Sequence, residues 1–263
     1  MAQNKNLTGK VAIVTGSSRG IGASIALKLA SHGADVVINY HSSVKAADAI
    51  AAKARDEHGV RAISIKADVS NQEDIARLFE TTKKELGRID IVMSNSGIEH
   101  FGNIDDVKGE EIDKVLAVNV KAQYFVAQQA HKHLEEGGRL ILISSVSAVM
   151  GFPRHAIYSA SKAAVTGMVK CLAWDFGARK ITVNCVAPGG VKSDMYAEAG
   201  KDYFPGNLSA EEIDAKVSQM SPLRRVGFPE DVAGVVALLA SEEAQWLTGQ
   251  TIHVSGGAHM ATS

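Results

Sequence analysis

Short apolar stretches recur along the chain and alternate with segments of helical length. Six of the seven stretches are nearly continuous apolar runs, as in strands buried on both faces of a parallel sheet. The seven begin at Val11, Asp35, Ala62, Ile89, Arg139, Ile181 and Thr251, and the helical segments include Ile21–His32, Val44–His58, Gln72–Leu86 and Glu110–Leu134. This alternation predicts an α/β fold: a Rossmann-type, doubly wound, mostly parallel seven-stranded sheet with right-handed connections.

One stretch, at about 191–225, is longer than an ordinary connection between elements. Ser209 followed by Glu212 three residues later is a capping box and predicts the start of a helix there. Long excursions at the carboxyl edge of such a sheet often cover a site, so we expect a short helical lid over the substrate; a plain surface insertion is the alternative. No linker or low-complexity stretch divides the chain, which predicts a single domain over residues 1–263.

Composition narrows the class of protein. The 263 residues are 46% hydrophobic and 22% charged, as in folded globular domains, and the net charge of −1 offers no basic excess for nucleic acid or an anionic membrane. Two cysteines, Cys171 and Cys185, cannot supply a four-ligand zinc site and are expected in the core. No histidine pair has metal-motif spacing, so we expect no metal. Without an apolar run of about 20 residues or a signal peptide, a soluble cytoplasmic protein is expected.

The first predicted strand runs into a glycine-rich turn, Thr15-Gly16-Ser17-Ser18-Arg19-Gly20-Ile21-Gly22. A dinucleotide pyrophosphate meets backbone N–H groups and the positive end of a helix at such a place, and side chains there would block its approach. The spacing GxxxGxG and its position between a strand and a helix therefore predict a dinucleotide site that includes Gly16, Ser18, Gly20, Ile21 and Gly22.

The residues after the second strand indicate which dinucleotide binds. An NAD site usually carries an acid there, whereas this chain has Asn39, Tyr40, His41 and Ser42, which suit a 2′-phosphate. Arg19 offers a planar fork for the same phosphate. These features favour NADP(H). Asp68 closes the third strand, where its carboxylate either accepts the adenine amine or caps a helix.

A second group of polar residues predicts acid–base chemistry. Tyr158 and Lys162 lie four residues apart and share one face of a predicted helix, and Ser145 ends the fifth strand. A nearby ammonium is expected to lower the pKa of a phenol, and the serine hydroxyl can hydrogen-bond a carbonyl oxygen. The three residues together predict carbonyl polarisation and proton donation beside a hydride source.

With these motifs the chain resembles the short-chain dehydrogenase/reductase family over essentially its whole length. The matching features are the glycine turn, Asp68, Ser94-Asn95-Ser96-Gly97, Asn119, Ser145, Tyr158-Ser159-Ala160-Ser161-Lys162 and Pro188-Gly189. The resemblance implies that Tyr158 is the general acid in reduction, that Lys162 lowers its pKa and holds the nicotinamide ribose, that Ser145 orients the carbonyl, and that Asn119 holds a relay water. It also extends the cofactor site to Val69, Asn95, Gly97, Tyr158, Lys162, Pro188, Gly189 and Val191.

Departures from the family pattern are similar to a smaller group, the fungal tri- and tetrahydroxynaphthalene reductases, versicolorin and anthrol reductases and a fungal 17β-hydroxysteroid dehydrogenase. These are the SNSG motif, VAPGGVKSDMY from Val186, Tyr203 followed by Phe-Pro-Gly-Asn, and SPLRRVG from Ser221. The resemblance implies an NADPH-dependent homotetramer that reduces keto tautomers of phenolic polyketides. It further implies that Met195, Tyr196 and Tyr203 line the substrate pocket; the alternative is that they only pack this segment onto the domain. We expect Ser145, Ser147, Tyr158 and Gly190 at the pocket as well.

Other functions share these residues. A 3-oxoacyl-carrier-protein reductase would have the same catalytic group and a basic patch at the pocket mouth, for which Arg154, Lys192, Arg224 and Arg225 are candidates. A hydroxysteroid or sugar-alcohol dehydrogenase and a non-catalytic NADP-binding regulator are further alternatives. The chain also continues beyond Ala258 as His259-Met260-Ala261-Thr262-Ser263, which leaves open whether its C-terminal carboxylate reaches a neighbouring subunit's pocket, as in several relatives.

Overall fold

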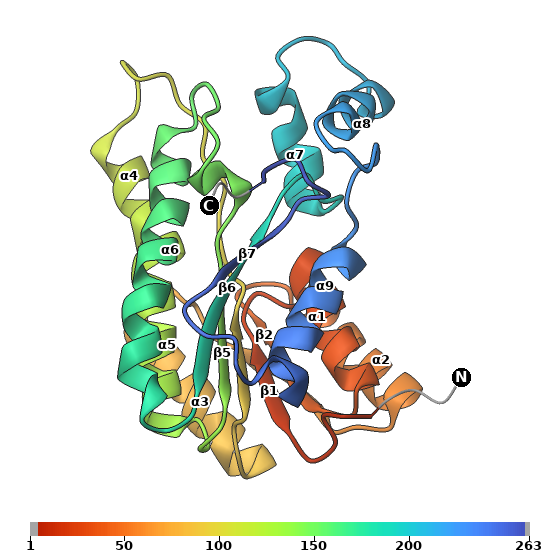
Figure 1. The fold of residues 1–263 in the computed structure, drawn as a ribbon, viewed down its shortest axis with the longest axis vertical. Helices are drawn as coiled ribbons and strands as arrows, with labels where there is room; N and C mark the ends of the chain where they lie inside the picture. The colour runs from red at the N-terminus through yellow and green to blue at the C-terminus, as the bar shows by residue number, and fades with distance from the viewer. Residues whose placement is uncertain (1–4, 261–263) are drawn as a thin grey trace.

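The computed structural model describes residues 5–260 of the chain. Seven parallel strands form one sheet in the order β3-β2-β1-β4-β5-β6-β7, with helices on both faces (Figure 1). The strands are β1 Val11–Val14, β2 Asp35–Tyr40, β3 Ala62–Lys66, β4 Ile91–Ser94, β5 Arg139–Ile143, β6 Thr182–Pro188 and β7 Thr251–Val254. The α-helices are α1 Gly20–Ser31, α2 Val44–His58, α3 Gln72–Leu86, α4 Gly109–Leu116, α5 Ala122–His133, α6 Ala156–Gly177, α7 Asp194–Tyr203, α8 Ala210–Gln219 and α9 Pro229–Ala240. The predicted doubly wound, Rossmann-type fold is confirmed.

The strand order reverses at β1, which lies between β2 and β4. One face of the sheet packs on α1, α2 and α9 and the other on α3, α5 and α6, each through its own apolar cluster. The continuous apolar runs are buried because both faces are covered; all four residues of β1 are buried. A ligand site in such a sheet lies beyond the carboxyl ends of the strands at the point of reversal, which is where β1 and β4 end.

Local sequence signals explain where several helices start and stop. The Asn71 side chain caps α3 by accepting the backbone N–H groups of Glu73 and Asp74 at 2.8 and 3.1 Å. Glycines in the left-handed region, Gly59 and Gly87, end α2 and α3. The predicted capping box of Ser209 and Glu212 is present at the start of α8.

Three sequence predictions need correction. The segment Glu110–Leu134 is not one regular helix, because a π-helical turn at Ala117–Lys121 separates α4 from α5. The region 191–225 contains a second helix, α7, capped by the Ser193 side chain, which accepts the N–H of Tyr196 at 3.2 Å. Of the two cysteines only Cys185 is buried; Cys171 on α6 is exposed.

Within residues 5–260 no helix is long and apolar enough to cross a bilayer. In the same residues no group of three or more histidine, cysteine, aspartate or glutamate side chains could hold a metal ion. The tail residues 261–263, on which the question of the neighbouring subunit depends, lie outside the described part of the chain.

Candidate active site

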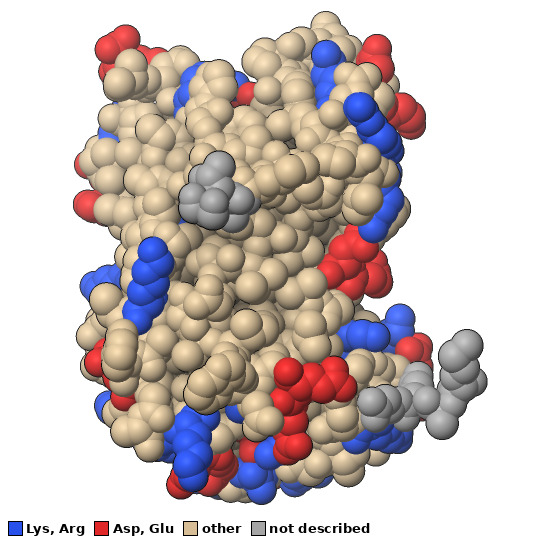
Figure 2. All heavy atoms as spheres, in the orientation of Figure 1, with Lys and Arg blue, Asp and Glu red and all other residues tan. Residues whose placement is uncertain are grey.

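A cleft of about 1220 Å³ opens at the carboxyl ends of the strands, between the sheet edge and helices α7 and α8. Figure 2 shows the notch where these two helices stand apart from the rest of the surface. Every residue predicted from the sequence to bind cofactor or substrate lines this cleft. Among the four predicted catalytic residues, Asn119 alone is absent from the lining; it is fully buried behind the wall.

The glycine turn has the backbone that a phosphate cradle needs. Gly16 and Gly20 have positive φ angles of 60° and 56°. A Cβ on Gly22 would overlap the carbonyl oxygen of Gly16 and the Asn95 amide. That amide donates to the carbonyls of Thr15 and Gly16 at 3.0 and 3.2 Å, so it fixes the turn to the end of β4. Only glycine fits these positions, and the free space fits a pyrophosphate.

Asn39 stands at the position where an acid would select NAD, and its side chain forms hydrogen bonds with the protein backbone. Its oxygen accepts the N–H of Gly16 at 3.0 Å, and its amide donates to the carbonyls of Ile65 and Ala67 at 3.3 and 3.1 Å. The side chain therefore ties the glycine turn to β3. The predicted hydrogen bond from Asn39 to a 2′-phosphate does not fit these contacts, which leaves that role to Tyr40, His41 and Ser42.

The largely exposed Arg19 side chain reaches across the cleft toward α7. Its guanidinium is 3.4 Å from the carboxylate of Asp194, at the start of α7. Both side chains are more than half exposed, so the pair contributes at most about 1 kcal/mol and can give way to a phosphate. Asp68 accepts from both the N–H and the hydroxyl of Ser70 and lies 3.6 Å from His41. It does not cap α3, because Asn71 does.

The predicted acid–base residues converge where β5 meets α6. Tyr158 and Lys162 are 6% and 3% exposed, and the ammonium lies 5.6 Å from the centre of the Tyr158 ring. The Ser144 hydroxyl donates to the Lys162 carbonyl at 2.8 Å, which joins the strand end to the helix. Ser145 lies at the end of β5, where its hydroxyl accepts the Ser147 N–H at 3.1 Å and can still donate to a substrate carbonyl.

The pKa values differ from the expectation that Lys162 lowers that of the phenol. Burial, followed by the nearby Glu99 carboxylate and by Tyr203, raises the pKa of Tyr158 well above its ordinary value. Burial lowers the pKa of Lys162 from 10.5 to about 8. The phenol therefore keeps its proton at neutral pH, as a proton donor in carbonyl reduction must.

Asn119 occupies the π-helical turn between α4 and α5. Its amide donates to the Ile98 carbonyl at 2.9 Å and to the Ser161 hydroxyl at 3.1 Å, and its oxygen accepts the Ile98 N–H at 2.9 Å. The side chain thus joins the segment after β4 to α6. Extra residues in a helical turn commonly mark functional positions, and here the turn aims an amide inward.

The hydroxyls of the two tyrosines in the lid, Tyr196 and Tyr203, both form hydrogen bonds within the protein. Tyr196 donates to Asp214 of α8 at 2.8 Å, and the Lys192 ammonium lies 2.5 Å from the same carboxylate. Burial, followed by the hydrogen bond to the Asp214 carboxylate and its charge, raises the pKa of Tyr196 above its ordinary value. Tyr203 contacts Glu99 and His155. Their rings line the cleft beside the half-exposed Met195. Their hydroxyls, however, form hydrogen bonds within the protein and are not free to bind a substrate.

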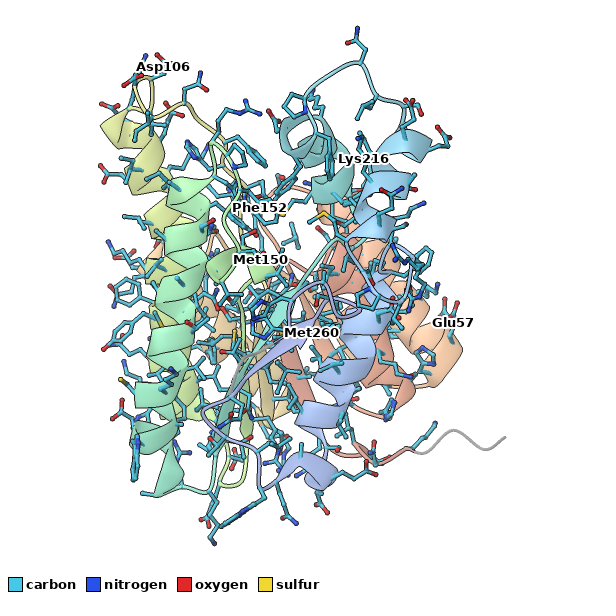
Figure 3. The ribbon with its side chains drawn as sticks, turned by 45° about the horizontal axis from the view of Figure 1, so that its top comes forward. Glu57, Asp106, Met150, Phe152, Lys216 and Met260 are labelled. Carbon is cyan, nitrogen blue, oxygen red and sulfur yellow. The ribbon has the colours of Figure 1, made fainter. Side chains whose placement is uncertain are left out.

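Sequence reasoning missed an aromatic cluster beside Tyr158. His155 is fully buried and its ring centroid lies 4.6 Å from that of Tyr158 and 4.4 Å from that of Phe101. Phe152 packs edge-on against Tyr203 at 5.2 Å and lines the cleft between α6 and the lid (Figure 3). No spacing rule singles out His155, because it lies just before the first residue of α6.

The chain is similar to known oxidoreductases in both sequence and structure. A family model described as enoyl-(acyl carrier protein) reductase matches residues 16–259. Versicolorin reductase 1 of Aspergillus parasiticus is 48% identical over 98% of this chain and 99% of its own. Trihydroxynaphthalene reductase of Colletotrichum orbiculare is 46% identical over 97% and 91%. A solved short-chain dehydrogenase from Burkholderia cenocepacia, in complex with NADP, has a TM-score of 0.87 at 37% identity and covers 96% and 99%.

The glycine turn, the buried tyrosine–lysine pair and the strand-terminal serine thus occur together in a chain that matches these proteins along nearly its whole length. This chain belongs to the short-chain dehydrogenase/reductase family of NAD(P)-dependent oxidoreductases.

Proposed function

We propose that the protein is an NADPH-dependent carbonyl reductase acting on the keto tautomer of a hydroxylated polycyclic aromatic polyketide. The observation that carries the substrate class is the aromatic wall beside Tyr158, to which Phe152 and Tyr203 contribute. Flat aromatic substrates pack well on such rings. The names of the relatives, versicolorin reductase and trihydroxynaphthalene reductase, support the same class.

The cleft residues fit NADP(H). The glycine turn offers the space and the backbone for the pyrophosphate, and Asn95, Gly97, Pro188, Gly189 and Val191 line the path onward. Arg19, Tyr40, His41 and Ser42 line the end where a 2′-phosphate would lie, and no carboxylate replaces Asn39 there. The bound cofactor supplies the hydride.

The protein supplies orientation and the proton. Ser145 donates a hydrogen bond to the substrate carbonyl oxygen, and Tyr158 delivers a proton to that oxygen as the bond is reduced. Lys162, whose ammonium lies 5.6 Å from the centre of the Tyr158 ring, would hold the nicotinamide ribose. Asn119 keeps the segment after β4 in register with α6 and, as in the family, would hold the water through which Tyr158 regains its proton.

A carrier-protein substrate is the second candidate, because the family model that matches carries such a description. An acidic carrier would need free basic residues at the cleft mouth. Three of the four candidates are paired: Arg154 with Asp202, Lys192 with Asp214, and Arg225 with Asp231. This pairing favours the aromatic substrate.

The region 191–225 is proposed as the substrate lid, since α7 and α8 form one side of the cleft. The resemblance further supports a cytoplasmic homotetramer. Trp174 on α6 and Tyr124 on α5, 88% and 51% exposed, leave apolar surface on helices that would pack against a second copy.

A single assay separates the candidates. NADPH consumption at 340 nm is followed with a hydroxylated naphthol or anthrol, kept in its keto form by reductant, and separately with an acetoacetyl thioester; NADH is the control cofactor. Turnover of the aromatic substrate with NADPH, and much less with NADH, is expected. Turnover of the thioester alone would refute the polyketide substrate and leave the catalytic residues in place.

A further inference from the structure

A buried polar network lies on the wall of the cleft next to Tyr158. It joins three segments far apart in sequence: Glu99 after β4, His155 just before α6, and Tyr203 at the end of α7. The His155 Nε2 atom is 3.0 Å from Glu99 Oε1 and 2.9 Å from the Tyr203 hydroxyl, which is 3.4 Å from the same carboxylate oxygen. Neither the predicted roles of the catalytic residues nor those of the cofactor residues use this network.

Both ring nitrogens of His155 have partners. His155 Nδ1 is 3.0 Å from the carbonyl oxygen of His100, which can only accept, so Nδ1 carries a hydrogen. Nε2 lies between two partners, the Glu99 carboxylate at 3.0 Å and the Tyr203 hydroxyl at 2.9 Å. The Glu99 carboxylate is therefore held from two sides, by the His155 ring and by the Tyr203 hydroxyl, which donates to Oε1 at 3.4 Å.

Glu99 is only partly buried, with 18% of its side chain exposed, and it lines the cleft, whereas His155 has no exposed surface. Oε1 faces both the His155 ring and the Tyr203 hydroxyl, and no described residue donates to Oε2. A carboxylate oxygen without a donor in a mostly enclosed cleft gains most from a ligand that supplies one. Phe152 and Tyr203 form the adjoining wall, so the donor that fits is a hydroxyl on a flat aromatic ring.

We infer that Glu99 is a specificity-determining residue that accepts a hydrogen bond from a phenolic hydroxyl of the substrate, and that His155 is the positioning residue that holds Glu99 against the cleft wall. This inference rests on the proposed function and refines its substrate class: the ring bears a donor hydroxyl in its neutral form, because a phenolate would be repelled by the carboxylate. A substrate with a methoxy group in place of the hydroxyl would be rejected.

The test measures binding without turnover. Dissociation constants for naphthol, methoxynaphthalene and naphthalene are measured by calorimetry with NADP⁺ present. The wild type is expected to bind naphthol at least 10-fold more tightly than methoxynaphthalene, as a hydrogen bond to a charged group allows. Glu99→Leu removes this preference and Glu99→Gln reduces it. Glu111→Gln, which alters the more exposed carboxylate paired with His100, serves as the matched control and keeps the preference.

His155→Phe keeps a ring to stack on Phe101 but loses both ring nitrogens. It is expected to lose the preference for naphthol while its affinity for naphthalene stays within about twofold, whereas a merely structural role would weaken both ligands together. The inference is overturned if wild type binds naphthol and methoxynaphthalene equally, if it binds neither, or if the preference survives in Glu99→Leu. Failure of the proposed function shows separately, as absence of aromatic ketone reduction with NADPH.

Discussion

The buried ammonium of Lys162 is expected to destabilise the folded protein, so replacing it should raise stability while abolishing activity. Lys162 is 3% exposed, and the only hydrogen bond of its ammonium to a described residue is a long one of 3.5 Å to the Ile143 carbonyl. Burial accordingly lowers its pKa from 10.5 to about 8. Lys162→Met keeps the aliphatic stem, removes the charge, and leaves the neighbouring Tyr158 in place.

The size of the effect follows from linkage. A fall in pKa from 10.5 to about 8 corresponds to roughly 3 kcal/mol of unfolding free energy, at about 1.4 kcal/mol per pH unit. The unfolded chain binds the proton more tightly, so the cost is present in full below pH 8 and disappears as the pH rises through 10.5. Wild-type stability should therefore gain from this group between pH 8 and 10.5, and the advantage of Lys162→Met should shrink over the same interval.

Urea unfolding followed by circular dichroism at pH 7 and pH 10 measures both quantities. Lys162→Met should be about 3 kcal/mol more stable than wild type at pH 7, and by less at pH 10. Lys170→Met, an exposed lysine on the same helix, is the control and should change stability by less than about 0.5 kcal/mol. If Lys162→Met is no more stable than wild type at pH 7, the ammonium is not paying a burial penalty and the reasoning fails.

Two further predictions concern the proposed roles of site residues. Tyr158→Phe should lower kcat by about 10²- to 10⁴-fold, because the proton donor is lost, while the NADPH dissociation constant from fluorescence titration changes by less than about tenfold; Tyr124→Phe, on an exposed tyrosine, should keep full turnover. Gly22→Ala should weaken NADPH binding and lower the unfolding free energy by about 1–3 kcal/mol, because its Cβ overlaps the glycine turn. Gly167→Ala on α6, with open space around it, should instead leave binding intact and slightly raise stability, so equal effects of the two substitutions would contradict the steric argument.

The strand and helix pattern predicted the fold because it depends on burial, which acts on every residue of an element. Continuous apolar runs such as Val11–Val14 fit only strands covered on both faces. The positions of candidate site residues at strand ends followed from the same pattern, since parallel strands end at one edge. For this reason the sequence alone predicts that Asn95 after β4 and Ser145 after β5 line one cleft, as they do.

Features that depend on single contacts could not be predicted. The π turn that carries Asn119 changes a helix by one extra residue per turn and leaves no periodicity signal over so short a span. The short helix α7 depends on the Ser193 cap, and its residues are mostly polar or small. The contact between His155 and Glu99 joins positions more than fifty residues apart, and neither residue stands out by spacing alone.

Sequence reasoning also treated every polar residue near the strand ends as available to a ligand, and the hydrogen bonds show that many are not. Asn39 and Asn119 use their amides to hold backbone segments together, and Tyr196 uses its hydroxyl to join α7 to α8. Each of these contacts gives a buried polar group the hydrogen-bond partner that it would otherwise lack. Among the described residues, few polar groups in the cleft can still form a hydrogen bond with a ligand. They are chiefly Ser145, Tyr158 and one oxygen of Glu99.

Close packing of the site residues also explains the glycine at position 97, which lies beside Lys162 and Asn119. A Cβ there would come within 3.1 Å of the Lys162 ammonium and 3.3 Å of the Asn119 oxygen. A larger residue would displace both, and with them the tie between the segment after β4 and α6. Glycine therefore relieves crowding with the side chains packed around this position, since Gly97 has no positive φ angle to account for it. The proposed active site thus depends as much on residues that hold the framework as on those that meet the substrate.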